Sequence, residues 1–299
     1  MGARIIDGRE VAAQMRAELK EQIDRLKGEG IVPGLGVVLV GEDPASASYV
    51  TGKQRACQEV GIYSEDHRLP ARTSQKDLLA LIARMNVDPK VHGILVQTPL
   101  PGHIDESEVL LAIDPAKDVD GLHPVNVGRM VTGRDAFLPC TPHGVVHLLI
   151  RSGVAIEGAN VVIVGRSILV GRPLANMLIQ KGKTGNATVT VCHTKTRDMA
   201  AHTRQADILI AAAGSPRMIT ADMVKEGAAV IDVGVNRVAD PSKRTGYRLV
   251  GDVDFEAVKE KASLITPVPG GVGPMTITML LYNTVQAATR HQADTVNRG

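Results

Sequence analysis

Tyr49 and Lys53 form the first pair of residues in this sequence whose types and spacing suggest chemistry. They lie four positions apart in a segment of helical periodicity, residues 46–60, and so share one face of the expected helix. A lysine ammonium shielded from water has a lowered pKa that suits it to proton transfer, and a neighbouring phenol can hold the amine. The same spacing also fits a surface lysine that lies over a tyrosine, so the pair alone leaves both interpretations open.

Polar and glycine-rich segments further along the chain could complete a ligand site. Gln97 ends the apolar run Gly93–Gln97, and open α/β sheets bind ligands at the carboxyl ends of their strands. Asp120 belongs to the compact loop Lys117–Pro124, which could equally be a turn with solvated acids. The segment Pro269–Thr276 has three glycines and two prolines before an expected helix, which suits close approach to a flat ligand.

A strand, a glycine turn and a helix start follow one another at residues 160–174. Gly165 permits a tight turn after the apolar run Asn160–Val164, and Pro173 suits the first turn of the next helix. Backbone N–H groups at such a helix start can bind a phosphate. The spacing is G-x-S-x-x-x-G rather than G-x-G-x-x-G, and an ordinary strand-to-helix turn would also fit these residues.

The end of the following strand favours NADP over NAD as the cofactor. Sites that prefer NAD carry an acidic residue there that binds the ribose 2′-hydroxyl. In this sequence, no Asp or Glu stands between Gly165 and Asp198. Arg166 and Thr194 are instead suited to a 2′-phosphate. Lys195 and Arg197 are better explained as a solvated helix start.

Composition excludes several other classes of protein. The 299 residues carry 34 Lys and Arg against 32 Asp and Glu, with no basic block of the kind that binds nucleic acid. The three cysteines are far apart without a CxxC spacing, so we expect neither disulfides nor a metal site. No apolar run approaches the roughly 18 residues that span a bilayer. The amino terminus lacks a secretory signal, so we expect a cytoplasmic protein without membrane contact.

Short runs rich in Val and Ile alternate with segments of helical period, which indicates an α/β fold with parallel strands. Pro- and Gly-rich interruptions at 139–142 and 266–274 predict a first domain over residues 1–140, completed by a terminal helix over 274–299, and an inserted domain over 141–273. Expected strands cover 36–40, 93–97, 160–164, 187–191, 207–212, 229–233 and 264–266, and expected helices cover 11–27, 46–60, 75–85, 143–151, 171–181, 254–261 and 275–289.

Several of these segments, in this order, resemble the motifs of one family, the bifunctional methylenetetrahydrofolate dehydrogenase/methenyltetrahydrofolate cyclohydrolases. The most specific is Pro269-Gly-Gly-Val-Gly-Pro-Met-Thr-Ile277, a complete match to the family signature. The resemblance covers nearly the whole chain, from Ile5 to Thr289. The other matching segments are Lys117–Pro124, Pro139–Pro142, Val164–Ser167, Val170–Pro173 and Ile231–Arg237.

The resemblance implies two α/β domains around a cleft, the first a folate-binding catalytic domain and the second a Rossmann-like NADP-binding domain. The implied reactions are NADP-dependent oxidation of 5,10-methylenetetrahydrofolate to the methenyl form and hydrolysis of that product to 10-formyltetrahydrofolate. The resemblance also implies a homodimer joined through its cofactor domains.

Residue roles follow from the same resemblance. It makes Lys53 the proton-transfer residue of the cyclohydrolase, Gln97 the support of its protonation state, and Asp120 the anchor of the pterin ring. Tyr49 belongs to the same catalytic set and could stack on a ring of the substrate. The remaining matched positions are Thr98, Gly273, Pro274 and Thr276 for the substrate, and Gly165, Arg166, Ser167, Thr194 and Val235 for NADP.

Two positions depart from the family pattern. Thr98 stands where leucine is usual, which concerns the shape of the folate pocket, and Arg55 replaces a second lysine while keeping its charge. Chain order argues against a short-chain dehydrogenase, in which the Tyr-x-x-x-Lys pair follows the glycine turn instead of preceding it. Two alternatives stay open, a two-domain NADP dehydrogenase of the shikimate type and a non-catalytic NADP-binding sensor. The Gly270–Thr276 loop and Asp120 argue against the first, and the second gives no reason for the catalytic set.

Overall fold

The computed structural model describes residues 2–243 and 245–296 and consists of two compact units, each with its own parallel sheet. The three-stranded unit comprises Ala13–Cys140 and the chain from Ile277 onward. The six-stranded unit comprises the chain up to Ala12 together with Thr141–Thr276. The α/β class and the presence of two α/β units, both predicted from the sequence, are confirmed.

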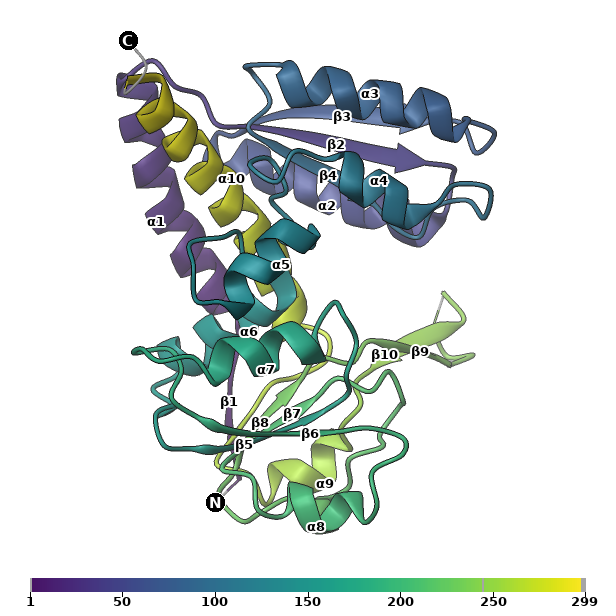
Figure 1. Cartoon of the computed structure of the whole chain (residues 1–299). Coiled ribbons are helices and arrows are strands. Elements are labelled where there is room, and N and C mark those ends of the chain that lie inside the picture. The colour runs from purple at the N-terminus through teal and green to yellow at the C-terminus, as the bar shows by residue number, and fades with distance from the viewer. Residues whose placement is uncertain (1, 244, 297–299) are drawn as a thin grey trace. The chain divides into compact units, whose positions relative to one another are not determined.

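The sheet of the three-stranded unit has the order β3-β2-β4 (Figure 1). Successive residues of a strand point to opposite faces, and Val38 and Val40 of β2 pack with side chains of α3 and α4 in one apolar cluster. The strands are β2 (Gly34–Val40), β3 (Tyr63–Leu69) and β4 (Gly93–Gln97), and the helices are α2 (Pro44–Val60), α3 (Gln75–Val87), α4 (Glu106–Ala112) and α5 (Pro124–Val131), with most of α1 (Gly8–Gly28) and α10 (Val272–Val296).

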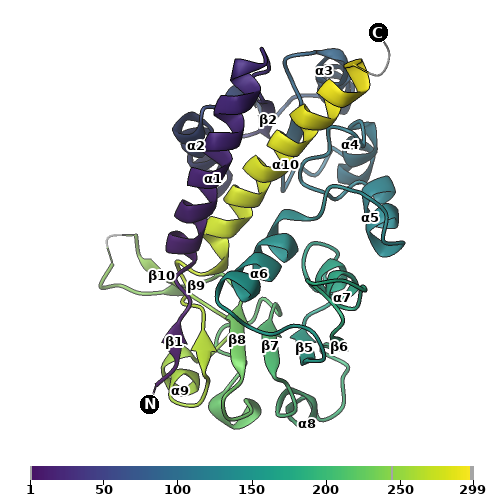
Figure 2. The same cartoon turned by 90° about the vertical axis from the view of Figure 1, so that its left-hand side faces the viewer.

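The sheet of the six-stranded unit is parallel and has the order β1-β11-β8-β7-β5-β6, whose central strands Figure 2 shows side by side. With β5 as the first strand, β6 follows on one side and β7, β8 and β11 follow on the other. The order therefore reverses between β5 and β7, and doubly wound sheets bind ligands at the carboxyl ends of the strands at such a point. The strands are β1 (Arg4–Ile5), β5 (Asn160–Val164), β6 (Thr188–Cys192), β7 (Ile208–Ala211), β8 (Ala229–Asp232) and β11 (Leu264–Ile265).

Helices and one hairpin complete the six-stranded unit. An apolar cluster joins Val162 and Val164 of β5 to Leu209 of β7 and Val230 of β8, and Val258 of α9 packs against it. The helices are α6 (Cys140–Arg151), α7 (Gly171–Leu178), α8 (Met199–Thr203) and α9 (Phe255–Lys259), with a 3-10 turn at Ala221–Met223, and the antiparallel hairpin is β9 (Asn236–Ala239) with β10 (Tyr247–Val250).

The amino-terminal segment departs from the predicted domain boundary, which kept residues 1–140 together. Strand β1 pairs in parallel with β11, with Ile5 beside Ile265, and the chain up to Ala12 belongs to the six-stranded unit. The three-stranded unit resumes at Ile277, whereas the prediction resumed it at residue 274. A strand of two residues carries no periodic signal, and its partner is distant in the chain, so the sequence pattern could not reveal this pairing.

The structure also contains strands that the apolar pattern did not predict. Strand β3 reads Tyr-Ser-Glu-Asp-His-Arg-Leu and lies at the edge of its sheet, where most of its side chains are half-buried. The β9–β10 hairpin is short, and its residues are exposed or half-buried, in strict alternation in β9. In these elements, backbone pairing with a neighbouring strand creates the structure, and side-chain hydrophobicity contributes little signal.

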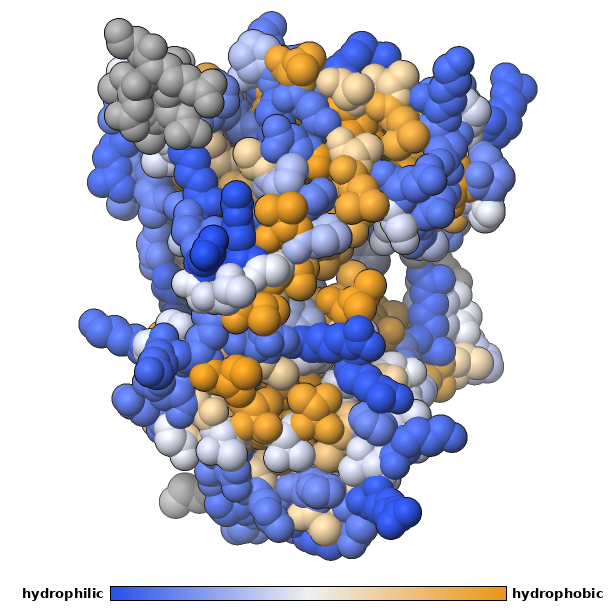
Figure 3. Space-filling view, viewed as in Figure 1, coloured by the Kyte–Doolittle hydropathy of each residue, from blue (hydrophilic) through white to orange (hydrophobic). Residues whose placement is uncertain are grey.

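Apolar groups interrupt a mainly hydrophilic surface in Figure 3. Within residues 2–243 and 245–296, no helix is both long enough and apolar enough to cross a membrane.

Candidate active site

Helix α2 brings the side chain of Lys53 to the carboxyl end of β4. The start of the helix is capped by the carboxylate of Asp43. Lys53 Nζ donates to Gln97 Oε1 at 2.9 Å, and Gln97 Nε2 donates to the carbonyl oxygen of Thr98 at 2.7 Å. The second bond orients the amide, so that its oxygen faces the lysine amine.

The charge state of Lys53 is set by burial and by nearby acidic groups. Burial lowers the pKa of the Lys53 ammonium, and the carboxylate of Asp120 is the largest influence in the opposite direction, followed by Cys140 and Cys57. An amine with a lowered pKa, beside an amide oxygen and a carboxylate, is suited to exchanging a proton with a bound molecule.

Tyr49 lies one helical turn before Lys53 on α2, and its side chain is 53% exposed. The lysine amine donates its hydrogen bond to Gln97. Because Tyr49 is exposed, its phenol ring is available to a ligand. Thr98 is exposed directly after β4. The three-stranded unit thus brings together Lys53, Gln97 and Asp120, and it places Tyr49 and Thr98 next to them in the chain or on the same helix face.

The loop that carries Asp120 is held by its other carboxylate, Asp118. The Asp118 side chain is buried and accepts hydrogen bonds from the backbone N–H groups of Leu122 and His123, at 3.2 and 2.8 Å, and from Asn126 Nδ2 at 2.9 Å. Burial raises the pKa of Asp118, and these hydrogen bonds oppose the rise. Asp118 is therefore structural, and the interpretation of this loop as a turn with two solvated acids is wrong for that residue.

Asn283 of α10 is a residue of this site that the sequence analysis missed. Its side chain is buried, and Nδ2 donates to the carbonyl oxygens of Val119 and Leu138 at 2.8 and 3.0 Å. The thiol of Cys140 donates to the same Val119 carbonyl at 3.4 Å. Asn283 therefore holds the backbone directly before Asp120. A single asparagine on the apolar face of a long helix was the available signal.

The glycine turn of the six-stranded unit has the backbone that close packing requires. Gly165 follows β5 with a φ of 126°, and a Cβ there would lie 2.0 Å from the carbonyl oxygen of Ala212. Ser167 Oγ accepts a hydrogen bond from the N–H of Val170 at 3.1 Å. Helix α7 begins at Gly171 without a side-chain cap. The N–H of Arg172 donates to the carbonyl oxygen of Ser167 at 3.1 Å, and Pro173 has no N–H, so within the first turn of this helix the N–H of Gly171 is left for a ligand.

The predicted cofactor residues follow the carboxyl ends of strands in the six-stranded sheet. Val164 of β5 pairs with Cys192 of β6, so the turn with Arg166 and the segment with Thr194 leave adjacent strands at their carboxyl ends. Arg166 and Thr194 are exposed. Val235 is 51% exposed and follows the carboxyl end of β8, at the same end of the sheet.

The signature loop also belongs to the six-stranded unit. Gly270 has a φ of 110°, the N–H of Gly271 donates to the carbonyl oxygen of Pro267 at 2.9 Å, and the hydroxyls of Thr276 and Thr141 lie 3.0 Å apart. Gly273 is exposed and Pro274 is half-buried. The predicted substrate residues are therefore divided between the two units.

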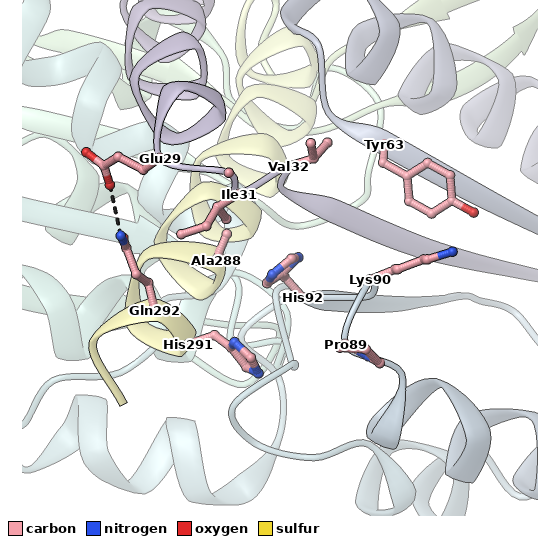
Figure 4. Close-up of a pocket in the computed structure, with 11 residues that line it drawn as sticks. Glu29, Ile31, Val32, Tyr63, Pro89, Lys90, His92, Ala288, His291 and Gln292 are labelled. Atoms are coloured by element: carbon pink, nitrogen blue, oxygen red, sulfur yellow. Dashed lines mark hydrogen bonds between the residues drawn. The ribbon is translucent and has the colours of Figure 1, made fainter. Parts of the chain in front are cut away.

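A cavity of about 790 Å³ lies at the amino ends of the strands in the three-stranded unit (Figure 4). Its lining includes Tyr63, Lys90, His92 and His291, and Gln292 Nε2 donates to Glu29 Oε2 at 2.9 Å at its rim. Lys53 and Gln97 meet at the carboxyl end of β4, so this cavity is distinct from the predicted site. Among the described residues, no group of three or more His, Cys, Asp or Glu side chains could hold a metal ion.

Two family descriptions match this chain in succession. Residues 6–120 match the tetrahydrofolate dehydrogenase/cyclohydrolase catalytic domain, and residues 139–292 match the tetrahydrofolate dehydrogenase/cyclohydrolase NAD(P)-binding domain. The chain belongs to the tetrahydrofolate dehydrogenase/cyclohydrolase family. The resemblance recognised from the sequence motifs is thereby confirmed.

Individual members of the tetrahydrofolate dehydrogenase/cyclohydrolase family are similar over almost their full length. The bifunctional protein FolD of Moorella thermoacetica is 61% identical over 290 residues, which cover 97% of this chain and 100% of that protein. The crystal structure of the bifunctional FolD methylenetetrahydrofolate dehydrogenase/cyclohydrolase from Campylobacter jejuni is 51% identical, with a TM-score of 0.91 and coverage of 97% of this chain and 99% of that one. The Trypanosoma brucei enzyme, complexed with NADP and an inhibitor, is 43% identical with the same TM-score of 0.91 and the same coverage.

Proposed function

We propose that the protein oxidises 5,10-methylenetetrahydrofolate to 5,10-methenyltetrahydrofolate with NADP and hydrolyses that product to 10-formyltetrahydrofolate. The observation that carries the proposal is the amine of Lys53, which is partly shielded from water, hydrogen-bonded to Gln97 and near Asp120. It belongs to a chain that matches both domains of the family. In the first reaction a hydride passes from the methylene carbon to the nicotinamide, which gives the cationic methenyl product and NADPH. In the second, water adds to that carbon and one proton is released.

Residues of the six-stranded unit fit a dinucleotide. The glycine turn after β5 and the backbone N–H of Gly171 at the start of α7 suit a pyrophosphate. The exposed side chains of Arg166 and Thr194 supply a cation and a hydroxyl next to that turn, which suits a 2′-phosphate and favours NADP over NAD. The cofactor supplies the hydride acceptor, and the protein's task in this reaction is to orient it against the substrate.

Lys53 serves the hydrolysis. A neutral amine accepts a proton from the attacking water, and the resulting ammonium returns it as the ring opens. The oxygen of Gln97 orients the amine, and Asp120 stabilises the ammonium while it exists. Asp120 also anchors the pterin ring, Tyr49 stacks on a ring of the substrate, and Thr98 binds folate. Gly273, Pro274 and Thr276 of the six-stranded unit also bind folate.

We also infer a homodimer joined through the six-stranded units. Strand β6 is an edge strand whose residues Thr188–Val191 are exposed or half-buried, so its backbone is available to a second copy. The cytoplasmic location stays a prediction.

A coupled assay tests the proposed function. Incubation with 5,10-methylenetetrahydrofolate and NADP should yield NADPH and then 10-formyltetrahydrofolate, each followed separately, and NAD should be a poorer oxidant. Lys53→Met should abolish the hydrolysis and leave NADPH formation measurable, whereas Lys76→Met removes an exposed cation of α3 and should change neither step. Unimpaired hydrolysis by Lys53→Met would disprove the role of Lys53, and accumulation of methenyl product by the unmodified protein would reduce the function to a dehydrogenase.

A further inference from the structure

Two aspartates that the sequence analysis did not single out are buried together in the six-stranded unit. Asp232 is the last residue of β8 and is 3% exposed, and Asp252 follows β10 and is 0% exposed. Neither has a cationic side chain among its hydrogen-bond donors in the described part of the chain. Buried carboxylates are unfavourable unless they are well hydrogen-bonded, so their partners indicate their purpose.

The carboxylate of Asp252 accepts four hydrogen bonds. Its Oδ2 accepts from the consecutive backbone N–H groups of Ala213 and Gly214 at 2.6 and 2.8 Å, and its Oδ1 accepts from the N–H of Ser215 at 2.9 Å and from Asn236 Nδ2 at 2.8 Å. Three successive N–H groups form a concave anion site, and here the protein's own carboxylate fills it. Asp252 thereby joins the loop after β7 to Asn236, the residue that begins β9 at the end of the loop after β8.

These two loops lie where a dinucleotide has to bind. The order of the sheet reverses between β5 and β7, and Ala213–Ser215 comes directly after β7 at that point. The glycine turn is in contact with the same loop, since a Cβ on Gly165 would lie 2.0 Å from the carbonyl oxygen of Ala212. Asn236 is the neighbour of Val235, one of the predicted cofactor residues.

The halves of the cofactor can be assigned to the two sides of this point. Arg166 and Thr194, which suit the 2′-phosphate of the adenosine half, follow the carboxyl ends of β5 and β6. A dinucleotide whose pyrophosphate lies at the glycine turn must therefore extend its nicotinamide half over β7 and β8. The loops held by Asp252 lie on that side.

Asp232 holds Asp252 in turn. Its carboxylate accepts hydrogen bonds from the backbone N–H groups of Gly234, Asp252 and Val253 at 3.0, 2.9 and 2.9 Å. The packing leaves no room for side chains beside the pair, because a Cβ on Gly234 would lie 2.2 Å from Oδ1 of Asp252, and a Cβ on Gly251 would lie 1.8 Å from Oδ2 of Asp232. The geometry of the two carboxylates is therefore closely defined.

We propose that Asp252 is a positioning residue for the nicotinamide half of NADP, because it holds the loops after β7 and β8 in the form that receives this half. The proposal rests on the proposed function. It predicts a selective defect, in which binding of the nicotinamide half is lost while binding of the adenosine half is kept.

Asp252→Asn tests the proposal with almost no change in shape. Whichever way the new amide turns, its NH2 group faces two N–H donors that the carboxylate accepted before, so the loops lose half of their anchors. We expect the Kd for NADP to rise at least tenfold. The Kd for adenosine 2′,5′-bisphosphate, which lacks the nicotinamide half, should stay within about twofold of the unmodified protein. Asp254→Asn, which removes the same charge two positions later, is the matched control and should leave both values unchanged.

A milder variant covers the case in which Asp252→Asn does not fold. Asn236→Ala removes one of the four donors and should raise the Kd for NADP less, by about threefold, again without affecting adenosine 2′,5′-bisphosphate. Unchanged NADP binding in the folded variants would overturn the proposal, and so would equal losses for both ligands, which would assign Asp252 to general stability. Both measurements are of binding, so they remain decisive if turnover of methylenetetrahydrofolate fails and refutes the proposed function.

Discussion

Replacing Gln97 by glutamate places a negative charge beside the amine of Lys53. The two side chains meet at 2.9 Å, and the amide oxygen of Gln97 already occupies the position that a carboxylate oxygen would take. A carboxylate there favours the ammonium form and raises the pKa of Lys53, which burial lowers in the unmodified protein. If the neutral amine is the active form, the cyclohydrolase should then require a higher pH.

The size of the effect follows from the distance and the surroundings. Two unit charges at the observed 2.9 Å attract by about 6 kcal/mol at an effective dielectric constant of about 20. One pKa unit corresponds to about 1.4 kcal/mol, which sets an upper limit of roughly four pH units on the change. Lys53 is half-buried, and solvent screening weakens the attraction, so we expect the midpoint of the pH–rate profile to rise by about one to two pH units. Well below both midpoints, the rate should fall by about 10- to 100-fold.

The assay is the initial rate of methenyltetrahydrofolate hydrolysis as a function of pH, corrected for the uncatalysed reaction. Gln97→Met is the matched control, because it removes the hydrogen bond to Lys53 without adding charge. Loss of a bond that favours the ammonium should move the midpoint downward or leave it in place. NADPH formation in the same samples reports whether the folate site is intact, since hydride transfer requires no proton from Lys53.

The opposite result has a clear meaning. A folded Gln97→Glu variant that forms NADPH normally, but whose hydrolysis midpoint stays in place or falls, would refute the assignment of proton transfer to the neutral amine of Lys53.

Three further predictions concern other parts of the molecule. Asn283→Ala removes the donor that holds the backbone before Asp120. We expect steady-state hydrolysis to slow by about 10-fold, which corresponds to the loss of one or two buried hydrogen bonds. A normal rate would contradict this role. Arg166→Ala should weaken NADP binding by about 10- to 100-fold, the value of a hydrogen bond to a charged group, while NAD binding measured by titration stays the same. Burial lowers the pKa of His92 to about 4, so between about pH 6.5 and pH 4 the unfolded chain binds a proton that the folded one does not. The free energy of unfolding should therefore decrease as the pH is lowered through this range, by up to about 3 kcal/mol. Urea unfolding at several pH values should show a smaller fall in His92→Gln, and an equal fall in both proteins would be evidence against this origin.

The fold class and the family were evident from the pattern of residues alone. Runs such as Val161–Val164 are apolar throughout because a parallel strand is buried on both faces, and this property is visible without coordinates. Gly165 and the signature loop Pro269–Thr276 are equally visible, because few residue types tolerate such backbone. Tyr49 and Lys53 could be placed on one helix face because helical spacing is a local property of the sequence.

Contacts between distant segments were decided only by the tertiary structure. Lys53 meets Gln97 across 44 positions, and Asn283 reaches Val119 across 164, so neither bond leaves a trace in local spacing. A buried carboxylate such as Asp252 has the same letter in the sequence as a solvated one. Only the folded chain surrounds it with backbone N–H groups, because donors of that kind belong to every residue and their direction depends on the path of the chain.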